Sequence, residues 1–73
     1  MTFAQYLAER PARFDIEGAF VRLARIDERM SRATSFAELF RQLKERDASF
    51  NVALAAQHVW TGYQRKLETE PDA

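Results

Sequence analysis

The sequence of 73 residues contains no cysteine and a single histidine. Without cysteine no disulfide can form, and one histidine without thiolates cannot supply the ligands of a four-ligand zinc site. No metal and no cofactor are therefore expected. A chain this short is near the lower size limit at which an apolar core alone is sufficient. The core must come from packing between elements, with association between copies as a possible extension.

The sequence also has no leader-like start and no long apolar run. Residues 1–6 lack a basic head followed by an apolar segment, so a signal peptide is not expected. The longest stretch without a charge, residues 48–64, includes Asn51, Gln57 and His58 and is shorter than the ~20 mostly apolar residues of a membrane span. These features predict a cytoplasmic protein that does not contact a membrane.

The uncharged stretch is the most informative feature that is present. The rest of the chain carries a charge every few residues, whereas this stretch holds many of the large apolar side chains. They are Phe50, Val52, Leu54, Val59, Trp60 and Tyr63. A helix that is apolar over most of its circumference has neighbours on several sides. We therefore expect a central helix, running to about Leu67, with the other segments packed around it.

The net charge of zero is unevenly distributed along the chain. Residues 1–67 hold all eleven basic side chains and eight of the eleven acidic ones, a net charge of 11 − 8 = +3. The last six residues carry the remaining three acidic side chains. We expect one helical domain over residues 1–67 and a short, frayed acidic tail over residues 68–73.

Capping patterns divide the domain into helices. Thr2 and Gln5 form a capping box for a first helix, which should end near Arg10 because a proline follows. Asp15 is a good cap for a second helix. Its expected apolar side comprises Ile16, Ala19, Phe20, Leu23, Asp27 and Met30.

The third and fourth helices have similar start signals. Ser35 and Glu38 form a second capping box, and the helix should continue to about Arg46. Its apolar stripe comprises Phe36, Leu39, Phe40 and Leu43. Either Asp47 or Ser49 should cap the final helix. The predicted fold class is all-α, a compact bundle of four to five helices around a long C-terminal helix.

Four arginines fall on one side of the second helix. Arg22, Arg25, Arg29 and Arg32 cluster opposite its apolar side. Arginine suits phosphate and carboxylate groups, so this stripe could bind nucleic acid or an acidic protein surface. The alternative is an ordinary solvated helix face, partly neutralised by Glu28.

The large apolar and aromatic side chains of the last helix fall into two groups. Trp60 and Tyr63 lie on one side and should be core residues that hold the first helix through Phe3 and Tyr6. Phe50 and Leu54 lie off that side, at the start of the helix. Either another segment covers them or they form an exposed contact for a partner.

No residue pattern indicates catalysis. His58 has no surrounding motif, the serines stand at helix starts, and the carboxylates lie on polar faces of separate helices. The third helix could serve as a recognition helix in DNA, although its outward residues are also ordinary surface residues. They are Arg41, Gln42, Lys44 and Glu45. The sequence favours a protein without enzymatic activity.

Several short patterns together resemble the YozE family of small bacterial proteins. The start Thr2-Phe3-Ala4-Gln5-Tyr6-Leu7 and the later Trp60-Thr61-Gly62-Tyr63 match the two ends of that family, and Ser35-Phe36-Ala37-Glu38 resembles its third helix. The chain departs from the family at Met30-Ser31, where Phe-Pro is usual, and at Ala56, where an aromatic residue is usual. The resemblance implies a SAM-like helical fold and little about activity.

SAM-like domains are mostly interaction modules. The resemblance therefore suggests an interaction role by analogy, but a fold does not decide function. We expect a non-enzymatic interaction domain that contacts an unidentified protein or a second copy of itself through Phe50 and Leu54. Nucleic-acid binding by Arg22, Arg25, Arg29 and Arg32 is the alternative.

Overall fold

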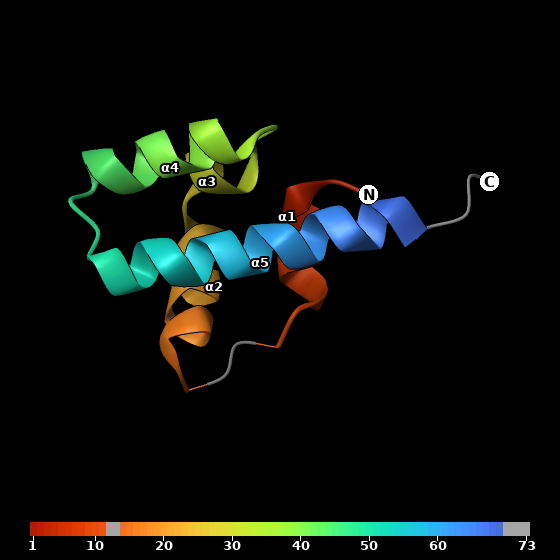
Figure 1. Ribbon diagram of the computed structural model, residues 1–73, viewed down its shortest axis with the longest axis horizontal. Coiled ribbons are helices and arrows are strands. Elements are labelled where there is room, and N and C mark those ends of the chain that lie inside the picture. Colours follow the sequence, from red (N-terminus) through yellow and green to blue (C-terminus); the bar gives the residue numbers. More distant parts are fainter. Residues whose placement is uncertain (12–13, 70–73) are drawn as a thin grey trace.

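The computed structural model describes residues 1–11 and 14–69, which form five helices and no strand. The helices are α1 (Phe3–Glu9), α2 (Ile16–Ile26), α3 (Glu28–Ser31), α4 (Phe36–Glu45) and α5 (Phe50–Thr69). α5 runs along the whole molecule, α4 lies antiparallel beside its first half, and α2 crosses it from behind (Figure 1). The predicted all-α class is confirmed.

α1 begins and ends as the sequence predicts. The Thr2 hydroxyl accepts a hydrogen bond from the Gln5 amide at 3.1 Å, and the Gln5 side chain accepts one from the Thr2 amide at 2.9 Å. This reciprocal pair satisfies two amides that the first turn leaves without helical partners. The chain leaves helical geometry at Arg10, the residue before Pro11.

The second predicted helix is broken in two at Asp27. Asp27 has extended backbone angles, so it ends α2 and also caps α3. Its carboxylate accepts hydrogen bonds from the amides of Arg29 at 2.9 Å and Met30 at 3.2 Å. The prediction of one helix that includes both Ile16 and Met30 is therefore wrong. The first amides of α3 have no backbone partner, and the Asp27 carboxylate accepts their hydrogen bonds instead.

The buried side of α2 also differs from the prediction. Ile16 and Ala19 are exposed, whereas Val21 and Ala24 are fully buried next to the expected Phe20. α2 packs mainly on α5, and the buried side of α5 includes the small side chains Ala55 and Ala56. Small side chains on both helices allow a close crossing, and the crossing selects a buried side that a helical wheel alone does not show.

The turn between α4 and α5 assigns separate roles to the two candidate caps. Asp47 has φ 55° and ends α4, with its amide bonded to the Lys44 carbonyl and the next amide bonded to the Leu43 carbonyl. This is a Schellman ending, which usually has glycine at the position of Asp47. The Ser49 hydroxyl accepts from the Val52 amide at 3.3 Å. Ser49, and not Asp47, therefore caps α5.

α5 is buried along one side only. Ala55, Ala56, Val59, Trp60 and Tyr63 form its buried side, and its uncharged polar side chains are exposed. The expectation of a helix surrounded over most of its circumference is therefore wrong. The absence of charge in residues 48–64 reflects polar but neutral residues on the exposed side, and not burial on every side.

An aromatic cluster joins α1 to the second half of α5. The Phe3 ring lies 4.7 Å from Trp60 and 5.2 Å from Tyr63, and the Tyr6 ring lies 5.5 Å from Tyr63, measured between ring centroids. The Tyr63 hydroxyl also donates to the Met1 carbonyl at 3.2 Å. The predicted role of Trp60 and Tyr63 as core residues that hold α1 is confirmed.

α5 extends further than the sequence predicts, into the expected tail. The helix continues to Thr69, so the first two residues of the predicted tail are helical, and residues 70–73 lie outside the described part of the chain. Within residues 1–11 and 14–69, none of the helices combines the length and apolar character needed to cross a bilayer.

Candidate interaction surface

Phe50 and Leu54 lie at an apolar groove between α4 and the start of α5. The groove has a volume of about 330 Å³. Its lining residues are Phe36, Phe40, Leu43, Lys44, Ala48, Phe50, Ala53, Leu54 and Gln57. The Phe50 side chain is 76% exposed and Leu54 is 39% exposed, so no other described segment covers them. The structure thus leaves these two predicted contact residues open.

Two aromatic side chains of α4 form the opposite wall of the groove. The rings of Phe36 and Phe40 lie 6.0 Å apart, and the Lys44 ammonium lies 4.9 Å from the centroid of the Phe40 ring. Phe40 is at the edge of the predicted apolar stripe and is 37% exposed, which corrects its expected burial. The position of Phe40 at the edge of the stripe could have indicated this exposure from the sequence alone.

A smaller hollow lies on the other flank of Leu54, towards α2. It is lined by Ile16, Glu17, Asn51, Leu54, Ala55 and His58. Ile16 is exposed here, and Leu54 belongs to both hollows. The exposed apolar side chains around these two adjoining hollows are Phe40, Phe50, Leu54 and Ile16, and we call this surface the contact band. Lys44 stands at its α4 end and Glu17 at its α2 end.

The predicted arginine stripe does not form one continuous helix face. The break at Asp27 separates Arg22 and Arg25 on α2 from Arg29 on α3 and Arg32, the residue that ends α3. Arg25 has a structural role, because its Nε donates to the Leu7 carbonyl at 2.9 Å and its Nη2 donates to the Arg10 carbonyl. These bonds satisfy carbonyls at the end of α1.

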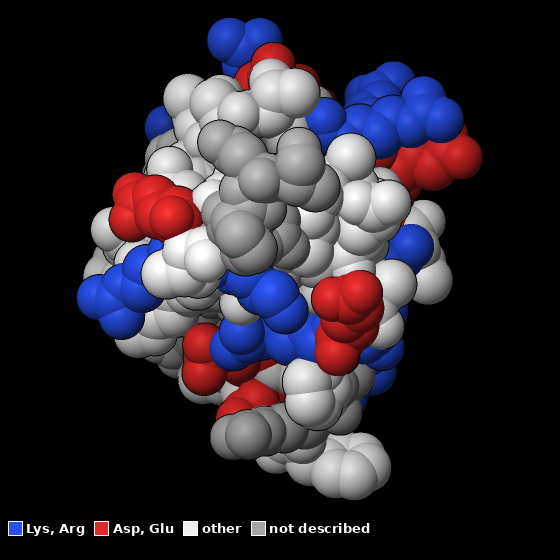
Figure 2. Space-filling model, turned by 90° about the vertical axis from the view of Figure 1, so that its right-hand side faces the viewer, with Lys and Arg blue, Asp and Glu red and all other residues white. Residues whose placement is uncertain are grey.

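The remaining arginines of the predicted stripe are exposed. The Arg22 guanidinium lies 5.8 Å from the centroid of the Phe14 ring. Arg29 makes a long, exposed ion pair of 4.0 Å with Glu45, an arrangement that contributes little to stability. On the face shown in Figure 2, basic and acidic side chains alternate, and neither sign forms a large patch.

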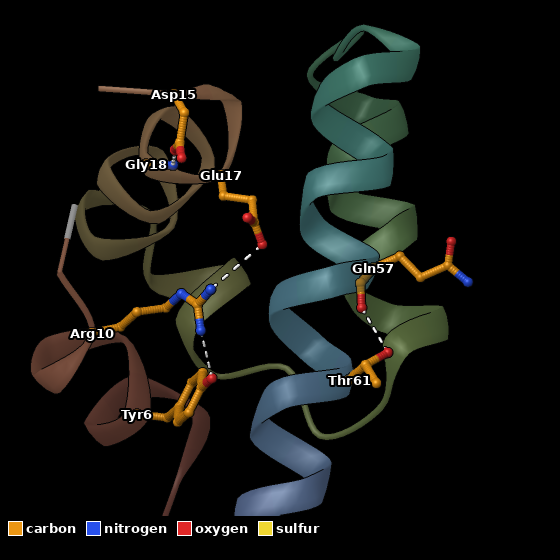
Figure 3. Close-up of polar contacts among 7 residues, drawn as sticks. All are labelled: Tyr6, Arg10, Asp15, Glu17, Gly18, Gln57 and Thr61. Carbon is orange, nitrogen blue, oxygen red and sulfur yellow. Dashed lines mark hydrogen bonds and ion pairs between the residues drawn. The ribbon is translucent and has the colours of Figure 1, made fainter. Parts of the chain in front are cut away.

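A polar chain between α1, α2 and α5 was not predicted. Arg10 Nη1 donates to the Tyr6 hydroxyl at 2.7 Å, and Nη2 lies 3.4 Å from Glu17 Oε1 (Figure 3). Gly62 of α5 lies so close that a Cβ there would be 2.6 Å from the Tyr6 hydroxyl oxygen. The missing side chain of Gly62 is therefore what lets this polar chain fit against α5.

The small hollow beside this chain has its charged groups paired within the protein. It has a volume of about 160 Å³ and is lined by Arg10, Pro11, Asp15, Glu17 and Gly18. The Asp15 carboxylate accepts from the Gly18 amide at 2.7 Å and thus caps α2 (Figure 3). Arg10 is held by Tyr6 and Glu17. The contacts of Asp15 and Arg10 therefore have a structural explanation.

One buried ion pair positions α4. The Asp27 side chain is 7% exposed and forms an ion pair with the Arg46 guanidinium at the end of α4. Burial acts to raise the pKa of Asp27, but hydrogen bonds from the Met30 and Arg29 amides and the charge of Arg46 together outweigh burial. The pKa of Asp27 consequently lies below its ordinary value.

The second capping box has a different geometry from the prediction. The Ser35 hydroxyl accepts from the Glu38 amide as expected, at 3.2 Å. The Glu38 carboxylate instead bonds the amide of Thr34 at 2.9 Å and its hydroxyl at 3.1 Å. These hydrogen bonds lower the pKa of Glu38.

Other possible sites are weaker. His58 is exposed. Within the part of the chain that the structure describes, no three His, Cys, Asp or Glu side chains are grouped so as to hold a metal ion. The indole N–H of Trp60 is buried without a hydrogen-bond partner in that same part. The tight packing of Phe3 and Tyr63 around the indole accounts for its burial.

No known family model, curated protein or solved structure was matched by this chain.

Proposed function

We propose that this protein is a non-enzymatic interaction domain that binds another protein chain through the contact band. The observation that carries the proposal is the exposure of Phe50 and Leu54 beside an apolar groove. A chain of this size has few large apolar side chains, and leaving several of them on one surface gives up burial that would stabilise the fold. Binding a partner would recover that burial.

The groove has the form expected of a protein-binding site. Its lining is mostly apolar and aromatic, with Lys44 as its one charged residue. Aromatic side chains that can be fully covered by a partner supply most of the binding energy in protein interfaces. Such a groove also suits an amphipathic helix laid along it. Membership of the YozE family, which the sequence resembles, is part of the same proposal.

The test compares two leucines of the same helix. Leu54 and Leu67 are 39% and 40% exposed, and only Leu54 lies in the contact band. We expect Leu54→Ser to reduce binding of partner protein in affinity capture from host extract at least tenfold, and Leu67→Ser to leave it unchanged. Equal capture by both variants, with both folded by circular dichroism, would contradict the proposal.

Nucleic-acid binding remains the alternative proposal, but the geometry favours it less. Arg25 is bonded to carbonyls of α1, and the break at Asp27 divides the other arginines between two helices. Binding through phosphates would weaken steeply with salt. Replacing Arg22 and Arg29 with Gln should flatten that salt dependence if this alternative holds, and titration with single- and double-stranded DNA at low salt measures it.

A further inference from the structure

We propose that the partner of the contact band is a second copy of this chain, and that the two copies form a two-fold symmetric dimer. This inference rests on the proposed function, since it names the occupant of the same surface. Three observations support it: the shape of the band, the charges at its two ends, and the electrical neutrality of its centre.

The shape of the band is self-complementary. Phe50 projects from the start of α5 and is mostly exposed, and the groove of about 330 Å³ lies directly beside it. A two-fold interface uses the same patch on both copies, so it needs a projection and a hollow on one surface. Here the Phe50 ring of each copy can enter the smaller hollow of the other, beside Ile16 and Leu54.

The charges at the ends of the band select one orientation. Lys44 borders the groove on the α4 side of Leu54, and Glu17 borders the smaller hollow on the α2 side. A two-fold axis that runs along α5 near Leu54 brings Lys44 of one copy opposite Glu17 of the other, twice in each dimer. An axis at right angles to α5 would oppose Lys44 to Lys44, and like charges facing each other disfavour an interface.

The centre of the band can be buried without a charge penalty. Residues 48–64 of α5 contain no charged side chain, so pairing two copies there desolvates apolar and neutral groups only. The formal net charge of the chain is zero, which removes long-range repulsion between copies. We therefore expect a reversible monomer–dimer equilibrium.

The first experiment measures the dissociation constant by sedimentation equilibrium over a concentration series. We expect a monomer–dimer equilibrium for the unmodified chain. Leu54→Ser should raise the dissociation constant at least tenfold, because each dimer loses two buried side chains. Leu67→Ser, the matched control at the other end of α5, should leave it unchanged.

The second experiment exchanges the end charges. Lys44→Glu places two carboxylates opposite each other at both ends of the interface, and Glu17→Lys places two ammonium groups there. Each variant alone should therefore dimerise at least tenfold more weakly. In an equimolar mixture, the heterodimer of the two variants places a carboxylate opposite an ammonium group at both ends of the interface. It should form a heterodimer with nearly the original affinity. Thermal unfolding followed by circular dichroism checks that each variant is folded, which matters for Glu17 because it also pairs with Arg10.

The outcomes separate this inference from the proposed function. A strict monomer at millimolar concentration overturns the dimer, and the proposed function still stands if Leu54→Ser abolishes capture of another protein. A dimer that neither Leu54→Ser nor the charge exchange affects overturns this interface. A strict monomer combined with capture that is insensitive to Leu54→Ser overturns both the dimer and the proposed function.

Discussion

Phe50 and Trp60 belong to the same helix, yet Phe50 is 76% exposed and Trp60 is 5% exposed. The difference lies in what each half of α5 faces. Around Trp60, α1 supplies aromatic rings that approach to 4.7 Å, and Phe50 has only the open groove beside α4. An aromatic residue in a helix therefore indicates burial only where another element supplies side chains to cover it.

The two halves of α5 thus have different tasks. The second half, with Trp60 and Tyr63, holds α1 through an aromatic cluster. In the first half, Ala55 and Ala56 are buried in the core, whereas Phe50 and Leu54 lie outside the core and carry the contact band. Substitutions that affect stability strongly in one half and weakly in the other test this division.

The largest effect is expected for the buried aromatic cluster. Trp60→Ala removes a ring packed on Phe3 and Tyr63. Replacing a buried aromatic side chain with alanine costs about 3–5 kcal/mol, which is a large part of the stability of a domain this small. Urea unfolding followed by circular dichroism measures the loss. A change below about 1 kcal/mol would show that the second half of α5 is not the centre of the core.

The next largest effect is expected at Asp27, which holds the end of α4, the helix that forms one wall of the groove. Asp27→Ala removes the cap of α3 and leaves Arg46, at the end of α4, without its buried partner. We expect a loss of about 2–3 kcal/mol, less than for a fully buried pair because Arg46 is half exposed. Asp27→Asn, which retains an oxygen to cap α3, should lose less. Equal losses for the two variants would contradict a contribution from the cap, and no loss for Asp27→Asn would contradict a contribution from the charge.

The same aspartate makes stability depend on acid. The pKa of Asp27 is lower in the folded chain than in the unfolded chain, so its contribution is fully present above the ordinary aspartate pKa. The contribution is lost as pH falls through the lowered folded pKa. Chemical unfolding between pH 6 and pH 2 should show a smaller acid loss for Asp27→Asn than for the unmodified chain. Identical profiles would contradict this assignment.

A smaller effect is expected where α1 meets α5. Gly62→Ala places a Cβ 2.6 Å from the Tyr6 hydroxyl oxygen and should cost about 1–2 kcal/mol through overpacking. In a Tyr6→Phe background that oxygen is absent, so the same substitution should be neutral or stabilising, because alanine favours helix over glycine. A double-mutant cycle from urea unfolding measures the coupling. Equal effects in both backgrounds would exclude this contact.

The sequence predicts the local structure well where the signal is local. The Thr2–Gln5 capping box, the end of α1 before Pro11 and the contact of Trp60 with α1 all depend on residues close in sequence or on strong aromatic patterns. The helical wheel also places Phe50 off the side that Trp60 and Tyr63 share. These features need no knowledge of how the helices cross.

The errors concern interactions between distant segments. The break at Asp27 is stabilised by Arg46 on another helix, and the periodicity around Asp27 continues as if the helix were unbroken. Arg25 looks like a surface residue until α1 is placed beside it. The contact band joins Ile16 with Phe40 and Leu54, and only the packing of α2 and α4 on α5 brings these side chains together.

The most direct test of the division within α5 is the free energy of unfolding of Phe50→Ser, measured by urea at a concentration where the chain is monomeric. We expect a value within about 0.5 kcal/mol of the unmodified chain, because a largely exposed side chain gives up little burial when it is replaced. A loss of about 2 kcal/mol or more would show that Phe50 is a core residue, and the contact band would then not be a free surface.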